Sequence, residues 1–194
     1  ESLISFNYRD FKPDDFVRET EFENLSLISA NANLTDLEQK LESKYKIYKL
    51  KEFLAKLESQ FDEIWLDTAP ALNFYTLSAL IAADRVFIPF DCDAFSRDAL
   101  FDLIGVIDEI REDHNEELKI GGIIINQFQE RAKLPAQAVA ELKSTKLKIL
   151  EPYLSSTVKI RESHHLKKPM VFLDPKHKVS EQITGLYKKI ARLR

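Results

Sequence analysis

The sequence predicts an α/β fold, in which a doubly wound, mostly parallel sheet is covered by helices on both faces. Segments with apolar residues at helical spacing alternate along the chain with short runs that are apolar throughout. Strands that are apolar at every position are typical of a parallel sheet buried on both sides. The chain has 194 residues, of which 44% are apolar, and this is enough for a single domain with its own core.

The first half of the chain predicts two strands and three helices. Residues 25–28 form a short apolar run. Thr35 and Glu38 have the spacing of a capping box and open a helix, and residues 50–61 carry leucines at helical spacing for a second one. The apolar run 64–66 predicts a strand, and a helix follows at 72–83.

The second half continues the alternation to the end of the chain. Apolar runs predict strands at 86–90, 120–125, 149–154 and 170–173. Ser96 is placed to cap a helix whose apolar stripe runs from Leu100 to Ile110. Further helices are expected at 135–143 and 179–193.

Polar side chains follow three of the expected strands where each strand ends. They are Asp67, then Asp91 and Asp93, then Asn126. Ligands of open α/β sheets bind beyond the carboxyl ends of the strands. A carboxylate in this position suits a magnesium-bound water in phosphoryl chemistry, although an Asp after a strand also serves simply to cap the next turn.

Charge is distributed unevenly along the chain. Residues 131–194 carry 15 Lys and Arg against 5 Asp and Glu, whereas residues 1–130 carry 13 against 27. Segregated charge of this kind indicates either a face that meets a polyanion or a lysine-rich solvated surface. Cys92 is the only cysteine, which excludes a disulfide framework within one chain and fits a reducing cytoplasm.

Several motifs occur in an order that resembles the ParA/MinD-type (Soj-like) partitioning ATPases. The segment from Phe61 to Pro70 is similar to that family's Walker B strand and the start of its switch II region. The other matching segments are Leu25 to Asn31, Leu77 to Leu80, Ala82 to Asp84, Val158 to Ser163, Lys168 to Val171 and Asp174 to Lys176. Together they cover residues from about 20 to 190.

The resemblance implies a P-loop NTPase-like fold of the deviant Walker type, with ATP and magnesium as cofactors. Asp67 would be the catalytic Walker B carboxylate that acts on magnesium through water, Thr68 would lie in the nucleotide site, and Asn126 would contact the adenine edge unless it only caps the following loop. Binding of non-specific DNA would fall to basic residues near the C-terminus: Lys159, Arg161, Lys167, Lys168, Lys176 and Lys178.

The resemblance further implies an ATP-dependent homodimer in the bacterial cytoplasm, associated with the nucleoid, with a ParB-like centromere-binding or activating partner and plasmid or chromosome cargo. Two departures from the family pattern stand out. Ser155-Ser156 replaces a Pro-Arg pair, and Ala69 replaces a proline. A MinD-like membrane-associated ATPase and a non-enzymatic α/β binding module are the alternatives, and residues 183–190 could form the lipid-facing side of a helix.

No glycine-rich phosphate loop occurs in the sequence. The four glycines are Gly105, Gly121, Gly122 and Gly185, and none precedes Lys-Ser or Lys-Thr. Backbone N–H groups of such a loop surround the phosphates in P-loop enzymes. We therefore expect residues 1–194 to be a single ParA-like domain whose phosphate-loop βαβ unit lies upstream of Glu1.

The 194-residue chain alone should therefore not hydrolyse ATP, because it offers no cradle for the β- and γ-phosphates. The measurement is magnesium-dependent phosphate release from the purified chain against a control without protein. Release clearly above that control would contradict the expectation.

Overall fold

The computed structural model describes residues 15–30, 33–43, 45–92 and 97–193. Its chain forms two compact units: residues 1–84 with 110–118, and residues 85–109 with 119–194. Each unit is described below by itself. The single domain expected from the sequence stays a prediction.

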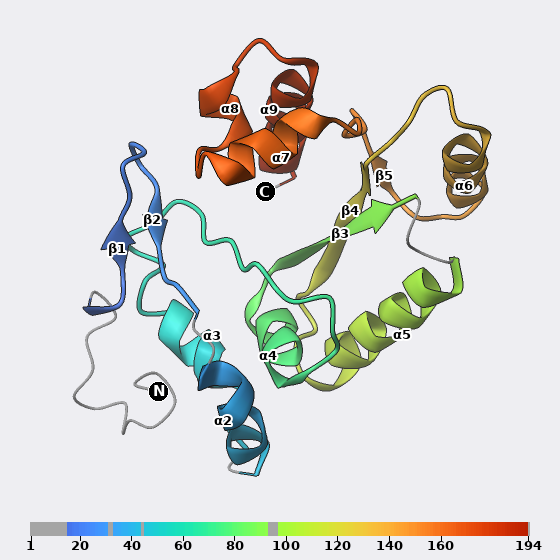
Figure 1. Cartoon of the computed structure of the whole chain (residues 1–194). Coiled ribbons are helices and arrows are strands. Elements are labelled where there is room, and N and C mark those ends of the chain that lie inside the picture. The colour runs from blue at the N-terminus through green and yellow to red at the C-terminus, as the bar shows by residue number, and fades with distance from the viewer. Residues whose placement is uncertain (1–14, 31–32, 44, 93–96, 194) are drawn as a thin grey trace. The chain divides into compact units, whose positions relative to one another are not determined.

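The first unit combines a small hairpin with three helices. Strand β1 (Arg18–Glu19) pairs antiparallel with β2 (Ser26–Leu27), which confirms a strand within 25–28. Helix α4 (Phe74–Ala82) packs against α2 (Asn33–Glu42) and α3 (Lys49–Leu54), as Figure 1 shows. The core of this unit consists of Leu41, Phe53, Leu57, Leu80, Ile81 and Leu118, all at most 6% exposed.

The first turn of α4 is fixed by side chains on both sides of it. Asn73 accepts a hydrogen bond from the Thr76 N–H at 3.1 Å, and Glu38 on α2 accepts one from the Phe74 N–H at 3.0 Å. The first N–H groups of a helix need such acceptors. The capping box expected at Thr35 is therefore wrong: α2 begins at Asn33, and Glu38 caps the neighbouring helix instead of its own.

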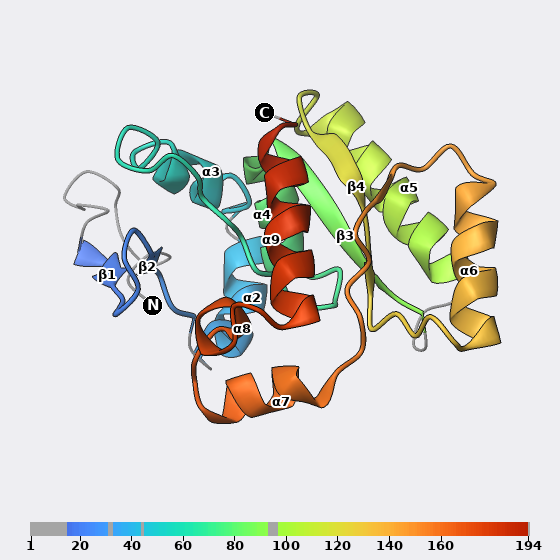
Figure 2. The ribbon, with the colours of Figure 1, turned by 90° about the horizontal axis from the view of Figure 1, so that it is seen from above.

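The second unit contains a parallel sheet with strand order β3-β4-β5. The strands are β3 (Arg85–Asp91), β4 (Lys119–Asn126) and β5 (Ile149–Leu150). Figures 1 and 2 show α5 (Arg97–Asp113) below this sheet and α9 (Lys178–Ala191) above it. Helices on both faces confirm the predicted α/β architecture. The remaining helices are α6 (Lys133–Lys143), α7 (Val158–His165) and α8 (Met170–Leu173).

Strand β4 contains a bulge at Gly121. Val86 lies opposite Ile120, but Phe87 lies opposite Gly122, so that Gly121 is an extra residue between two paired positions. The ring of Phe87 occupies the space beside it: a Cβ at Gly121 would lie 2.3 Å from the ring atom Cε1. Beyond the bulge the pairing is regular to Asp91 and Asn126, and Ile123 and Ile125 are fully buried.

Two of the predicted strands differ from the structure. Residues 64–66 have no regular secondary structure and form no strand with any described residue, and Trp65 is 57% exposed. Their apolar character indicates burial, yet a strand also needs a neighbouring backbone to pair with. Residues 170–173 form the single helical turn α8, because Pro169 starts a turn whose carbonyl accepts the N–H groups of Phe172 and Leu173.

Helix α7 has no counterpart among the predicted elements. It is short, and Val158 is 65% exposed, so its apolar pattern is weak. Thr157, whose hydroxyl accepts a hydrogen bond from the Lys159 N–H at 3.3 Å, is the signal that marks its start.

Replacing Gly121 by alanine should destabilise the second unit by about 1–3 kcal/mol, because the added methyl group overlaps the Phe87 ring. Gly105→Ala is the matched control. No atom lies within 4 Å of a Cβ there, and an exposed glycine inside a helix gains about 0.5–1 kcal/mol on becoming alanine. Denaturant unfolding of both variants checks the opposite signs, and equal effects would contradict the bulge assignment.

Candidate functional site

Asp67 and Thr68 lie in the first unit, near the end of segment 63–69, which has no regular secondary structure, and both are exposed. The chain that follows is held at the start of α4, where the Thr76 hydroxyl donates a hydrogen bond to the Ala71 carbonyl at 2.7 Å. The segment thus presents a carboxylate and a hydroxyl to solvent from a backbone that is anchored a few residues later. Oxygen ligands of this kind suit magnesium and its water molecules.

Asn126 lies in the second unit, at the carboxyl end of β4, and is half-buried. Its register partner on β3 is Asp91. The next residue, Gln127, has a left-handed backbone with φ 51°, and its side-chain amide donates a hydrogen bond to the Asp91 carboxylate. Polar groups from two neighbouring strands therefore meet at this edge, as the sequence predicts for Asp91 and Asn126. Asp93 lies outside the described residues.

Gln127 was not among the predicted site residues. The one signal in the sequence is that a polar residue directly follows the end of an apolar strand. Neither its left-handed backbone nor its contact with Asp91, which is 36 residues away, can be read from local pattern.

Asp67 and Thr68 in the first unit offer oxygen atoms of the kind that magnesium prefers. Asn126 in the second unit offers an amide at a strand edge. The four glycines lie on α5, on β4 and on α9, so none of them forms a loop that could surround phosphates. Among the described residues, the glycines therefore provide no phosphate cradle of this kind.

The six basic residues predicted to bind DNA come from a continuous part of the second unit. Two lie on α7, two in the turn after it, and two around the start of α9. Helix α8 packs against both α7 and α9, and Figure 2 shows the three helices as one cluster. Lys159 is half-buried and the other five are exposed. We call this set the basic surface: Lys159, Arg161, Lys167, Lys168, Lys176 and Lys178.

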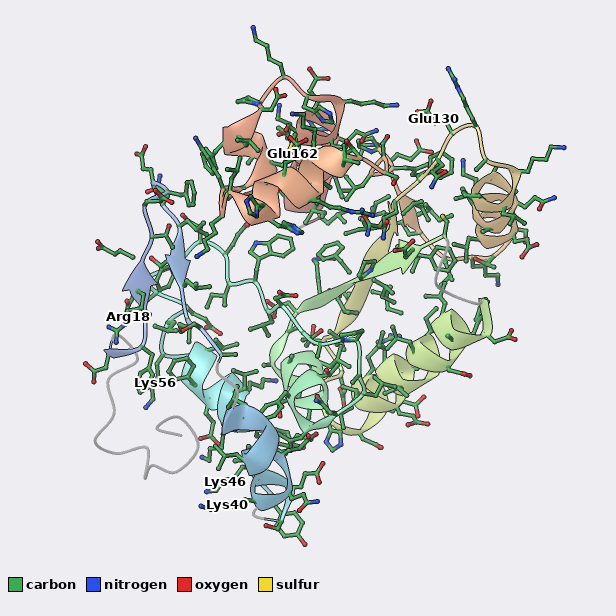
Figure 3. The ribbon with its side chains drawn as sticks, viewed as in Figure 1. Arg18, Lys40, Lys46, Lys56, Glu130 and Glu162 are labelled. Carbon is green, nitrogen blue, oxygen red and sulfur yellow. The ribbon has the colours of Figure 1, made fainter. Side chains whose placement is uncertain are left out.

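Two members of the basic surface already hold an acidic partner. Lys159 pairs with Glu162 at 2.8 Å, and Lys178 pairs with Glu130 at 2.6 Å; both acids are labelled in Figure 3. The hydrogen bond to Glu162 raises the pKa of Lys159, and the hydrogen bond from Lys178 lowers the pKa of Glu130. Among the described residues, the other four members have no ion-pair partner: Arg161, Lys167, Lys168 and Lys176.

Lys167 and Lys168 are displayed by the end of α7. Lys167 has a left-handed backbone with φ 51°. Its N–H donates to the His164 carbonyl at 3.1 Å, and the Lys168 N–H donates to the Ser163 carbonyl at 3.0 Å. This pair of bonds is a Schellman motif, which usually has glycine at the left-handed position. The motif ends the helix abruptly and leaves two adjacent lysines exposed.

The other sequence features find ordinary structural places. His164 and His165 are exposed in the last turn of α7, and no group of three His, Cys, Asp or Glu among the described residues could hold a metal ion. The apolar side of α9 faces inward, with Leu186 buried and Ile183 and Ile190 half-buried. None of the helices in the described ranges has the length and apolar character needed to cross a membrane.

Comparison with known proteins supplies the family. A family model described as an AAA domain matches residues 2–120. The chromosome partitioning protein ParA of Myxococcus xanthus is 29% identical over 180 residues, which are 92% of this chain and 64% of that protein. The chain therefore spans less than two thirds of that relative's length.

Two solved structures share the fold. Cobyrinic acid a,c-diamide synthase from Mycobacterium smegmatis, crystallised with ADP and magnesium, aligns with a TM-score of 0.70 at 27% identity, over 76% of this chain and 61% of that one. McdA from Cyanothece, in a complex with ATP, aligns with a TM-score of 0.81 at 20% identity, over 93% and 72%. The fold is thus that of the P-loop NTPases, and the chain belongs to the ParA/MinD-type family of partitioning ATPases.

Proposed function

We propose that the full-length protein is a ParA-like ATPase that binds ATP with magnesium, dimerises on ATP and associates with DNA without sequence preference to partition plasmid or chromosome cargo. The DNA-binding part of this proposal rests on the basic surface. Its six cations come from one cluster of helices and lie within twenty residues of sequence, in a chain with the fold of this ATPase family. A ParB-like activating partner and an association with the nucleoid follow from the same proposal.

On this proposal, Asp67 acts at the metal side of the nucleotide. Bound magnesium supplies positive charge that offsets the charge developing on the transferred phosphoryl group. The exposed Asp67 carboxylate would hold the magnesium through water, and Thr68 adds a hydroxyl beside it in the sequence. The capped start of α4 limits how far this pair can move, because Asn73, Glu38 and Thr76 hold the turn that follows.

The adenine side is assigned to Asn126. Its half-buried amide offers both a donor and an acceptor at a strand edge, which is what the edge of an adenine ring requires. The hydrogen bond between Gln127 and Asp91 joins the ends of β3 and β4 there. Asn126 therefore lies at the end of β4, and the end of β4 is held against the end of β3.

The basic surface supports DNA over a membrane as the matrix. The apolar residues of α9 that a lipid-binding helix would need are packed inward, whereas the lysines and arginine of the basic surface stay accessible. A MinD-like role would require the α9 face to turn outward. A non-enzymatic binding module is the remaining alternative, and hydrolysis by the full-length protein separates it.

In the full-length protein, Asp67→Ala should lower the rate of ATP hydrolysis about 10²-fold or more, because the metal and the attacking water lose their carboxylate. Asp102→Ala, which removes an exposed carboxylate from α5, is the matched control and should keep the parent rate. Turnover by the Asp67 variant within a few-fold of the parent would refute the Walker B assignment.

Two double variants test the DNA surface: Lys159→Ala/Arg161→Ala and Lys167→Ala/Lys168→Ala. Each should weaken binding to all DNA sequences alike. Lys167→Ala/Lys168→Ala should flatten the log–log dependence of affinity on salt by roughly 2, because two phosphate contacts and their released counterions are lost. Lys159→Ala/Arg161→Ala should flatten it by less, between about 1 and 2, because Lys159 is already paired with Glu162. Anisotropy titrations at several salt concentrations measure both quantities. Lys146→Ala/Lys148→Ala, an exposed pair outside the basic surface, is the control. Unchanged affinity and slope in both test variants, with nucleotide binding intact, would reject this surface.

Removing the charge of Glu162 or Glu130, the acidic partners of Lys159 and Lys178, should change DNA affinity in the opposite direction. Glu162→Gln and Glu130→Gln should each strengthen DNA binding and steepen the salt dependence by up to about 1, because a lysine that was paired within the protein becomes available to a phosphate. The same titrations measure this effect. Weaker binding in both variants would mean that these carboxylates orient the lysines for DNA instead of competing with it.

A further inference from the structure

The segment after β5 lies along the end of β4. The Leu154 N–H donates to the Ile125 carbonyl at 2.9 Å, the Phe128 N–H donates to the Leu154 carbonyl at 2.9 Å, and the Ser156 N–H donates to the Phe128 carbonyl at 3.2 Å. We call residues 154–156 the return segment. These hydrogen bonds involve Ile125 and Phe128, the residues before and after Asn126 and Gln127. The return segment therefore lies beside the strand end that carries Asn126.

Ser155, in the middle of the return segment, is held from the other side by α9. Its N–H donates to Oε1 of Gln182 at 3.0 Å, and Nε2 of the same amide donates to the Ser155 hydroxyl at 2.9 Å. Both residues are half-buried. One side-chain amide therefore satisfies the backbone donor and the hydroxyl together, and it fixes the distance between α9 and the return segment.

The need for this contact comes from the serine at position 155. The ParA/MinD-type pattern that the sequence resembles has Pro-Arg where this chain has Ser155-Ser156. A proline has no N–H and needs no acceptor, whereas a half-buried serine N–H without a partner is destabilising. Gln182 supplies the acceptor that the serine requires.

We propose that Gln182 is a positioning residue for the base side of the nucleotide site, acting through Ser155 and the return segment on Asn126. The inference rests on the proposed function, because it assumes that Asn126 meets a purine base. When Gln182 is removed, the Ser155 N–H loses its partner and the return segment is free to shift beside Ile125 and Phe128. The amide of Asn126 then loses a defined orientation, while the contacts that the nucleotide makes through its phosphates and magnesium are kept.

The test compares the full-length protein with its Gln182→Ala variant. Binding constants are measured for Mg-ATP, for Mg-GTP and for magnesium tripolyphosphate, which carries no base. We expect the preference for ATP over GTP to fall roughly tenfold in Gln182→Ala while tripolyphosphate binding stays within about twofold of the parent. Gln137→Ala, an exposed glutamine on α6, is the matched control and should behave as the parent does.

Rescue makes the test specific. The double variant Ser155→Pro/Gln182→Ala has no N–H left to satisfy, so it should regain most of the parent's preference for ATP. Should Gln182→Ala fail to show a cooperative melting transition, Ser155→Ala serves in its place: it keeps the N–H bond to Gln182, loses only the hydroxyl contact, and should show a smaller loss of preference.

The possible outcomes distinguish a failure of the proposed function from a failure of the role of Gln182. A parent protein that does not bind Mg-ATP overturns the proposed function together with this inference. A parent that binds Mg-ATP, with Gln182→Ala unchanged in its preference for ATP, overturns the role of Gln182 alone. Equal loss of ATP, GTP and tripolyphosphate binding, without rescue by Ser155→Pro, also overturns it, because Gln182 would then stabilise the fold in general.

Discussion

The parallel pairing of β3 with β4 is the constraint on which the second unit depends. Seven register pairs run from Arg85 with Lys119 to Asp91 with Asn126, and the bulge at Gly121 shifts the register once between them. Without that extra residue the two strand ends would not bring Asp91 opposite Asn126. The same strand end then receives the return segment, which is tied in turn to α9. The candidate base site is thus positioned by backbone pairing that starts far from it.

The sequence pattern predicts a helix or strand correctly where its apolar content and the spacing of its apolar residues indicate the same element. The apolar run 120–125 and the helical stripe of 179–193 correspond closely to β4 and α9, because both are long and strongly patterned. The strand expected at 170–173 fails because four apolar residues fit a strand or one helical turn equally well, and the hydrogen bonds to the Pro169 carbonyl favour the turn. The strand at 64–66 fails for another reason, since pairing depends on a partner that local pattern cannot supply.

In the candidate site too, local pattern identifies some residues, whereas others depend on contacts with distant residues. Asp67 and Asn126 could be named as candidates because each comes at the end of an apolar run in an α/β chain, and their roles stay predictions. Gln127 and Gln182 could not, because their contacts join residues 36 and 27 positions apart, and a glutamine in a loop or on a helix carries no local mark of such a contact. The departures from the family pattern were nevertheless informative. Ser155 departs from the proline of the pattern that the sequence resembles, and in the structure Gln182 accepts a hydrogen bond from the Ser155 N–H.

The six cations of the basic surface differ in how far their charge is neutralised by neighbouring carboxylates. Lys159 and Lys178 are partly neutralised by carboxylates that are themselves at least half exposed, at 50% and 65%, so water and salt weaken both ion pairs. A phosphate that approaches either lysine must compete with the carboxylate, and the exchange releases fewer counterions than a contact with Lys167 or Lys168 does. The lysines at the end of α7 would therefore set most of the salt dependence of DNA binding. The two paired lysines would add affinity only where the DNA lies close enough to displace Glu162 or Glu130.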